Sequence, residues 1–202
     1  MIGALCLLSA CQNIPFTQTN KPVNDSDFSL ETVAKTDINM VLDIHVKVLE
    51  QHLYSLMLKL YLRNPGYWRN SGFENAEARV KHVLALPDYR VSKMVENTRS
   101  IESLQLAFEP AYMGDRVLAF VFGLKTMLRD AYGGRREFFV LDQLDPQKLY
   151  DSARNIEVAV WKLSNDRLPG GQLYLISNEL QGRLKNLSFE RLFGKMIAVQ
   201  DN

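Results

Sequence analysis

The sequence predicts an all-α fold, an irregular bundle of about six helices around a long central helix with little or no sheet. Three observations carry this expectation. Apolar residues recur at spacings of three and four through most of the chain after residue 37. Prolines and glycine pairs divide this region into pieces of helical length, and no internal repeat indicates a solenoid. Only residues 137–141 and 172–176 resemble strands, and two short strands cannot form a substantial sheet.

The strongest periodic signal predicts the central helix, from about Asp37 to Arg63. Its main apolar stripe alternates spacings of four and three, and a second apolar set lies on nearly the opposite side. A helix that is apolar on two sides usually packs between neighbours on both. It should end at Asn64-Pro65-Gly66, because proline cannot continue the hydrogen-bond ladder. The main stripe is Leu42, Val46, Leu49, Leu53, Leu56 and Leu60, and the second set is Met40, Ile44, Leu58 and Leu62.

Three further helices follow, each with a recognisable end. Residues 74–86 carry apolar residues on one side and stop at Pro87, and residues 98–108 stop before the next proline. Asp115 predicts an N-cap for a strongly apolar helix, because its side chain can accept a hydrogen bond from the first turn. Gly133-Gly134 then supplies the residue type that commonly ends a helix.

The last third of the chain predicts another long helix and two shorter pieces. Asp145-Pro146 combines a cap with a proline at the first helical position, and the spacing of four and three continues to Leu163. Leu168-Pro169-Gly170-Gly171 breaks this helix. A short piece around residues 177–184 and a last helix from Ser188 complete the expected bundle.

The first eleven residues, MIGALCLLSAC, form a short apolar stretch without acidic residues that ends in Leu8-Ser9-Ala10-Cys11. This stretch resembles the lipobox of bacterial lipoprotein precursors, in which a peptidase cuts before a lipid-modified cysteine. The resemblance implies a signal peptide over residues 1–10, lipidation of Cys11 and a place in the cell envelope. No Lys or Arg precedes the stretch, which a translation start upstream of Met1 would explain. The alternative is an apolar N-terminal strand or helix packed on the domain, with a free Cys11.

Residues 11–30 are expected to be the lipidated cysteine and a flexible tether, because residues 12–27 are polar, contain two prolines and lack an apolar period. Residues 31–202 are then a single helical domain. Gln12 follows the cysteine, and by resemblance to the sorting pattern of enterobacterial lipoproteins this favours the periplasmic face of the outer membrane. The longest strongly apolar run after residue 11, at 117–124, is too short to cross a bilayer, so we expect the acyl chains to be the anchor.

Composition and motifs exclude several classes of activity. The 24 basic and 23 acidic side chains nearly cancel, so we expect no nucleic-acid partner. Cys6 and Cys11 are the only cysteines, and processing before Cys11 leaves no thiol for catalysis, disulfides or metal binding. His45 and His52 share a helical face but lie two turns, about 10 Å, apart, too far to hold one ion easily. We therefore expect no metal, no cofactor and no catalytic residue.

Two groups of residues are candidates for binding, and each has an alternative explanation. Tyr67, Trp68 and Arg69 combine aromatic rings with a cation, which is typical of protein interfaces. Alternatively, the rings cover the end of the central helix. Arg135 and Arg136 follow a glycine pair, where guanidinium groups and backbone amides could bind a lipid phosphate or a peptidoglycan carboxylate. Alternatively, the segment is a helix end followed by surface charges.

Glu157 lies among apolar residues of a predicted helix, where a buried carboxylate would have a raised pKa and could act as an acid or base. The alternative is a charge on the solvated side of that helix, because unpaired Glu is rarely buried.

Parts of the middle of the chain are similar to small, uncharacterised proteobacterial proteins. The similar segments are Gly114-Asp115-Arg116, Ala131-Tyr132-Gly133-Gly134 and residues 144–155. This resemblance covers about a quarter of the chain and implies no activity.

Two function classes remain. The first is a membrane-anchored lipoprotein without enzymatic activity that binds other envelope proteins. The second is a carrier, in which the central helix lines a cavity for a lipid or another apolar ligand. A well-packed core argues against the carrier, whereas a contiguous apolar pocket between helices argues for it.

Overall fold

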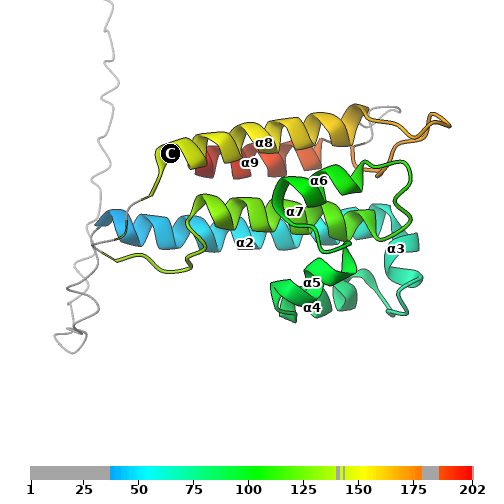
Figure 1. Cartoon of the computed structure of the whole chain (residues 1–202), viewed down its shortest axis with the longest axis horizontal. Helices are drawn as coiled ribbons and strands as arrows, with labels where there is room; N and C mark the ends of the chain where they lie inside the picture. Colours follow the sequence, from blue (N-terminus) through cyan, green and yellow to red (C-terminus); the bar gives the residue numbers. More distant parts are fainter. Residues whose placement is uncertain (1–36, 140–141, 143, 179–186, 202) are drawn as a thin grey trace, which may run out of the picture. The chain divides into compact units, whose positions relative to one another are not determined.

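The structure is a computed structural model that describes residues 37–139, 142, 144–178 and 187–201. These residues contain eight helices and no β-strand, which confirms the all-α bundle (Figure 1). None of these helices is long and apolar enough to cross a bilayer. The helices are α2 (Asp37–Arg63), α3 (Pro65–Arg69), α4 (Ala76–Ala85), α5 (Asp88–Met94), α6 (Ser100–Ala107), α7 (Arg116–Ala131), α8 (Pro146–Asn165) and α9 (Ser188–Asp201).

Two short helices, α3 and α5, were not expected, and both begin at prolines that were predicted to be stops. Pro65 lies in the first turn of α3, and Pro87 is the N-cap of α5. Proline lacks an N–H and has a helical φ angle. It therefore ends one helix and also suits the start of the next.

The two strand-like segments form no strand where the structure describes them, at residues 137–139 and 172–176. Both segments donate backbone hydrogen bonds to polar side chains, one from α2 and one from Asn64, the residue that follows α2. The Phe138 N–H donates to Asp43 Oδ1 (2.9 Å), and the Ile176 N–H donates to Asn64 Oδ1 (2.9 Å). Side chains thus accept the hydrogen bonds that a neighbouring strand would accept in a sheet. Residues 140–141 and residues 179–184 of the short piece expected at 177–184 lie outside the described part of the chain.

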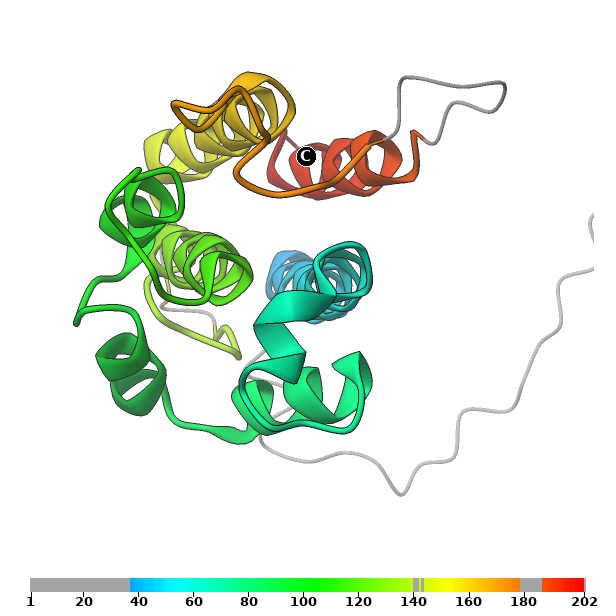
Figure 2. The ribbon, with the colours of Figure 1, turned by 90° about the vertical axis from the view of Figure 1, so that its right-hand side faces the viewer.

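α2 packs against α7, α4 and α9, as expected for the central helix (Figure 2). Its main stripe is buried between Leu49 and Leu60, and Met57 and Tyr61 widen that stripe. The expectation of a second buried side is wrong, because the neighbours of α2 cover this one broad stripe and its flanks. Three members of the second set are exposed, namely Met40 (46%), Ile44 (56%) and Leu62 (62%).

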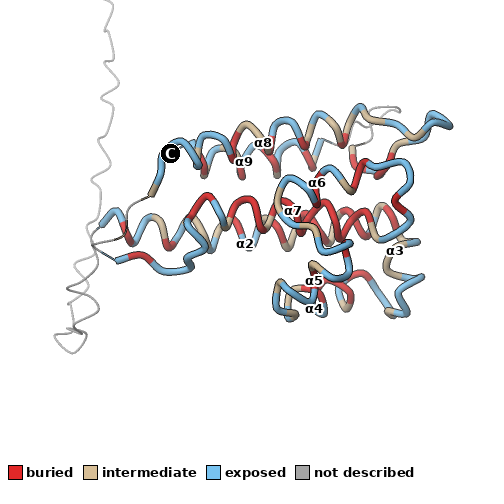
Figure 3. The backbone as a smooth tube through the Cα atoms, viewed as in Figure 1, coloured by how far each residue is buried: buried red, intermediate tan, exposed pale blue. Residues whose placement is uncertain are grey.

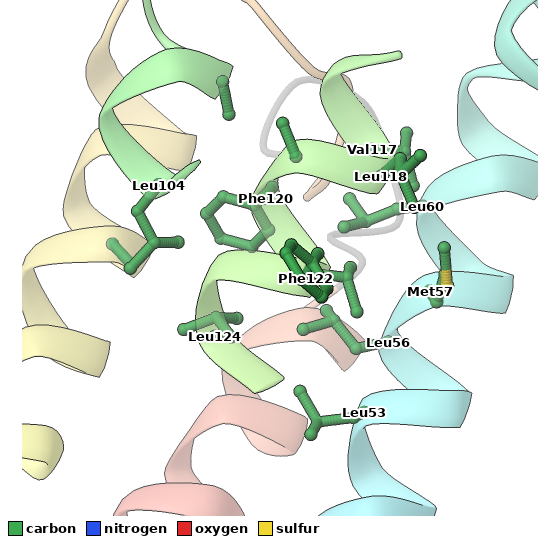
Figure 4. Close-up of a cluster of buried hydrophobic side chains, with 14 of the residues drawn as sticks. Leu53, Leu56, Met57, Leu60, Leu104, Val117, Leu118, Phe120, Phe122 and Leu124 are labelled. Atoms are coloured by element: carbon green, nitrogen blue, oxygen red, sulfur yellow. The ribbon is translucent and has the colours of Figure 1, made fainter. Parts of the chain in front are cut away.

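α7 is buried along almost its whole length, because apolar residues occupy nearly every side of it. All its residues except Lys125, Arg129 and Asp130 are buried (Figure 3). The helix contacts α2, α6 and α8. Figure 4 shows side chains of α7 lying between Leu104 of α6 and the apolar side chains of α2. The core is therefore built around α7 as much as around α2.

Both ends of α7 have the predicted caps. Asp115 Oδ1 accepts a hydrogen bond from the Leu118 N–H (2.9 Å) at the start. At the end, the Gly133 N–H donates to Asp130 O (3.0 Å) and the Gly134 N–H donates to Arg129 O (2.8 Å). This pair of bonds is the Schellman arrangement, and the positive φ angles of the two glycines, 65° and 77°, permit it.

Gly123 lets α6 approach α7 closely. A Cβ atom at this position would lie 2.8 Å from the Leu104 backbone nitrogen and 2.9 Å from Ser100 O. The close approach also brings polar side chains of α6 within hydrogen-bond distance of α7. Ser103 is fully buried, and its Oγ donates to Ala119 O at 2.8 Å. The α6–α7 contact therefore depends on the absence of a side chain at residue 123.

We predict that Gly123→Ala lowers the free energy of unfolding by about 1–3 kcal/mol, because the added methyl group meets backbone atoms that cannot move aside cheaply. Gly194→Ala is the matched control, since Gly194 is an exposed glycine in α9 with no atom close to its missing Cβ. Helix propensity should raise the stability of that control by up to about 1 kcal/mol. Urea unfolding of both variants measures the difference, and equal stabilities would contradict the close contact.

Candidate functional site

The predicted interface group Tyr67, Trp68 and Arg69 lies in α3 and does not form an exposed aromatic surface. Tyr67 and Trp68 are partly buried and pack against the core. Burial also raises the pKa of Tyr67 above its usual value. The Arg69 guanidinium lies 5.0 Å from the centre of the Trp68 ring and is exposed. The two rings therefore pack against the core and leave little aromatic surface for a partner.

A different aromatic surface lies on α8, on the side away from the core. Tyr150, Val158 and Trp161 are 55%, 54% and 61% exposed. Their spacing places them on one side of the helix, opposite the buried Ile156 and Leu163. Pale blue along the upper edge of α8 marks this exposed side in Figure 3.

Arg154 joins these side chains into one surface. Its guanidinium lies 5.2 Å from the centre of the Tyr150 ring, and it pairs with Glu157 (3.0 Å) and with Asp201 of α9 (3.1 Å). Glu157 is 46% exposed, so it is a charge on the solvated side of α8 and not a buried acid. We call Tyr150, Arg154, Val158 and Trp161 the α8 surface.

An apolar groove between α6 and α8 continues the α8 surface. Ile101, Leu104 and Phe108 line it from the side of α6, and Val158 and Lys162 line it from α8. Val158 belongs to both features, so groove and surface are continuous. The helical spacing of α8 contained a signal for this site, because it places Trp161 opposite the apolar stripe of the helix.

The predicted anion-binding residues, Arg135 and Arg136, lie beside a second hollow, between α2 and the C-terminal end of α7. We call this hollow the basic cleft. Its cavity volume is only about 30 Å³, and the rest of the hollow is open to solvent. Its apolar lining includes Val46, Leu49, Leu53 and Leu128, and its cationic lining is Lys125, Arg129, Arg135 and Arg136.

The backbone amides near Arg135 do not contribute to anion binding, contrary to the expectation from the glycine pair. The amides of Gly133 and Gly134 close the end of α7, and the Arg135 N–H donates to Tyr132 O (3.3 Å). The side chains of Arg135 and Arg136 line the basic cleft. The predicted helix end and the predicted arginine pair therefore coexist, with separate roles.

A buried group of ionisable residues joins α2, α4 and the start of α7. The Tyr61 hydroxyl donates to Asp115 Oδ2 (2.7 Å), and Arg79 Nη2 donates to the same oxygen (3.1 Å). Arg79 and the Asp115 side chain are only 4% and 11% exposed. Burial, followed by the charge of Asp115, raises the pKa of Tyr61 far above its usual value, so the phenol stays protonated.

This group resembles a catalytic constellation in its residue types, but every member has a structural partner. Asp115 also caps α7, and Arg79 packs 5.2 Å from the centre of the Phe73 ring. Arg116 is likewise buried, and its guanidinium donates to Ala107 O (2.9 Å) and Tyr112 O (2.6 Å) beyond the end of α6. These polar groups connect elements of the fold, and their partners are intramolecular.

His45 and His52 lie on the side of α2 that faces α9. Burial lowers the pKa of both, and the charge of Lys195 on α9 lowers that of His52 further. No cluster of three or more His, Cys, Asp or Glu side chains suited to a metal ion occurs among the described residues.

Comparison with protein-family models, curated proteins and solved structures finds no match to this chain.

Asp115 should contribute more to stability than an ordinary helix cap. We predict that Asp115→Ala lowers the free energy of unfolding by about 3–5 kcal/mol, because it leaves Arg79 buried without its carboxylate. Asp145→Ala removes the matching exposed cap of α8, where Oδ1 accepts from the Gln147 N–H, and should cost about 1 kcal/mol. Tyr61→Phe, which removes the hydrogen bond to Asp115 and the one from Arg79, should cost about 1–2 kcal/mol. Equal losses for the two cap variants in urea unfolding would show that the buried pair adds nothing.

Proposed function

We propose that this protein is a lipid-anchored, non-catalytic binding module of the cell envelope, held at the periplasmic face of the outer membrane. On this proposal, the α8 surface binds another envelope protein. The anchor is Cys11 and the tether is the polar segment that follows it.

The exposure of the Trp161 side chain supports the binding role. Its side chain is 61% exposed in a helix that buries Ile156, Ala159 and Leu163 on the opposite side. Folding of this chain therefore makes little use of the largest apolar side chain in α8. Exposed Trp, Tyr and Arg side chains are enriched among residues that dominate protein–protein binding. The neighbouring apolar groove offers a partner additional surface to bury.

The buried polar groups support a non-catalytic role. Asp115, Arg79 and Tyr61 satisfy one another, and Arg116 is occupied by backbone carbonyls. A catalytic acid, base or nucleophile needs access to a substrate. The hydrogen bonds of these four side chains instead connect elements of the fold.

The filled middle of the bundle gives no support to a carrier that encloses its ligand. Leu56 and Leu60 of α2 and Phe120 and Leu124 of α7 have none of their surface exposed. Figure 4 shows the first pair on the side of α7 that faces α2 and the second pair on the side that faces Leu104 of α6, so α7 is packed on both sides. Binding at the surface is the simpler proposal.

Support for the anchor comes from the sequence Leu8-Ser9-Ala10-Cys11 and the proline-containing tether, which lie outside the described residues. A tether of about 20 residues would hold the domain roughly 25 Å from the membrane on average, from the scaling of a flexible coil. A partner in the same membrane would then meet the α8 surface at a high effective concentration.

We predict that a photo-crosslinking amino acid in place of Trp161 captures a discrete envelope protein in living cells of the native host. Position 89 is the matched control, because Tyr89 on α5 is equally exposed (62%) but lies on a different helix. In a Cys11→Ser background the crosslink at position 161 should weaken, because the module is no longer held beside its partner.

Two results would count against the proposal. The same products at positions 161 and 89 would mean that α8 has no special role in binding. A crosslink at 161 that is unchanged by Cys11→Ser would mean that the anchor does not place the module beside its partner.

A further inference from the structure

The floor of the basic cleft is apolar and belongs to the two central helices. Val46, Leu49 and Leu53 follow one another along one side of α2, and Leu128 faces them from α7. Leu49, Leu53 and Leu128 are 2–4% exposed, whereas Val46 is only partly buried. An apolar group entering the cleft would therefore meet Val46 first and the leucines behind it.

The rim of the cleft carries four cations and one carboxylate. Lys125 and Arg129 come from α7, and Arg135 and Arg136 come from the segment after it. Glu50 is the one carboxylate among the lining residues. The cleft therefore presents an excess of positive charge at its mouth, although the chain as a whole is almost neutral.

Carboxylates outside the cleft hold three of these cations in place. Asp88 of α5 pairs with both Lys125 (2.9 Å) and Arg129, and Asp142 pairs with Arg135 (3.2 Å). Burial alone would raise the pKa of Asp88, but the hydrogen bond and charge of Lys125 and the charge of Arg129 bring that pKa below its usual value. One carboxylate thus orients two cations and neutralises only one of them.

Arg136 is the cation most easily turned toward a ligand. It is 71% exposed, and its pair with Glu50 is long, at 3.7 Å between Nε and Oε1. Exposed pairs of this kind contribute little to stability. An anion at the mouth of the cleft can therefore take this guanidinium from Glu50 at small cost and bind it through two parallel hydrogen bonds.

We propose that the basic cleft binds an amphiphile with one anionic head group, a phosphate or a carboxylate attached to an alkyl chain. The head group lies among the four cations, and the first methylenes of the chain lie against Val46 and the leucines behind it. A free inorganic anion would use the rim but not the floor. A cationic amphiphile would use the floor but meet repulsion at the rim. This site is separate from the α8 surface and does not depend on the anchor at Cys11.

The test is a set of calorimetric titrations of the full chain in phosphatidylcholine nanodiscs. The ligands are hexyl phosphate, hexanoate, inorganic phosphate and hexyltrimethylammonium. Each buried methylene is worth about fourfold in affinity. Hexyl phosphate or hexanoate should therefore bind at least about tenfold more tightly than inorganic phosphate, and hexyltrimethylammonium should not bind. Tighter binding of hexyl phosphate indicates a phospholipid as the natural ligand, and tighter binding of hexanoate indicates a fatty acid.

Two variants separate the rim from the floor. R135A/R136A should weaken hexyl phosphate binding by about tenfold or more. The control K81A/R90A removes the same charge from exposed positions on α4 and α5, and it should change hexyl phosphate affinity by less than about twofold. Val46→Thr should weaken hexyl phosphate binding and leave inorganic phosphate unchanged. The two arginines are exposed and Val46 is only partly buried, so circular dichroism should show that these variants fold.

The proposal is wrong if hexyl phosphate and hexanoate do not bind, or bind no more tightly than inorganic phosphate. It is also wrong if K81A/R90A weakens binding as much as R135A/R136A, since the effect would then come from net charge alone.

Discussion

The close contact of α6 with α7 at Gly123 is the constraint on which the rest of the structure depends. The missing side chain lets the backbone of α6 lie against α7, where Ser103 donates into that helix. α7 can then be covered on several sides at once, by α6, α2 and α8. A helix with apolar residues on nearly every side needs such cover, because its exposed area would otherwise oppose folding. The caps at Asp115 and at Gly133-Gly134 fix where this buried helix begins and ends.

The two surfaces proposed for binding follow from the same arrangement. α6 and α8 both lie against α7, and the space between them is the groove that continues the α8 surface. On another side, α7 leaves Lys125 and Arg129 outside the core, and these residues join Arg135 and Arg136 at the basic cleft. Asp130, the third unburied residue of α7, pairs with Arg99 (2.7 Å) and takes no part in either surface. The unburied residues of α7 therefore either line the basic cleft or form an ion pair with the residue before α6.

Local chemistry made much of the fold predictable, because caps and prolines act within a few residues of where they occur. Asp115, Asp145 and the glycine pair all end or begin helices as expected. Tertiary contacts were not predictable in the same way. Periodicity could not reveal that none of the described helices covers Met40 and Ile44, or that Arg79 reaches Asp115 across 36 residues of sequence. Arg135 and Arg136 were candidates from the sequence, and the structure places them at the basic cleft. Tyr67 and Trp68 were also candidates but pack against the core, whereas the exposed Trp161 was not a candidate, because residue types alone do not tell which aromatic side chain is buried.

On the proposed function, an anchor at Cys11 would hold the α8 surface beside its partner. Metabolic labelling with a radioactive fatty acid in the native host tests this anchor, and Cys6 provides a control within the same segment. We expect the wild type and Cys6→Ser to incorporate label and Cys11→Ser not to do so. A wild type that never incorporates label, or a Cys11→Ser variant that still does, would overturn the proposed anchor.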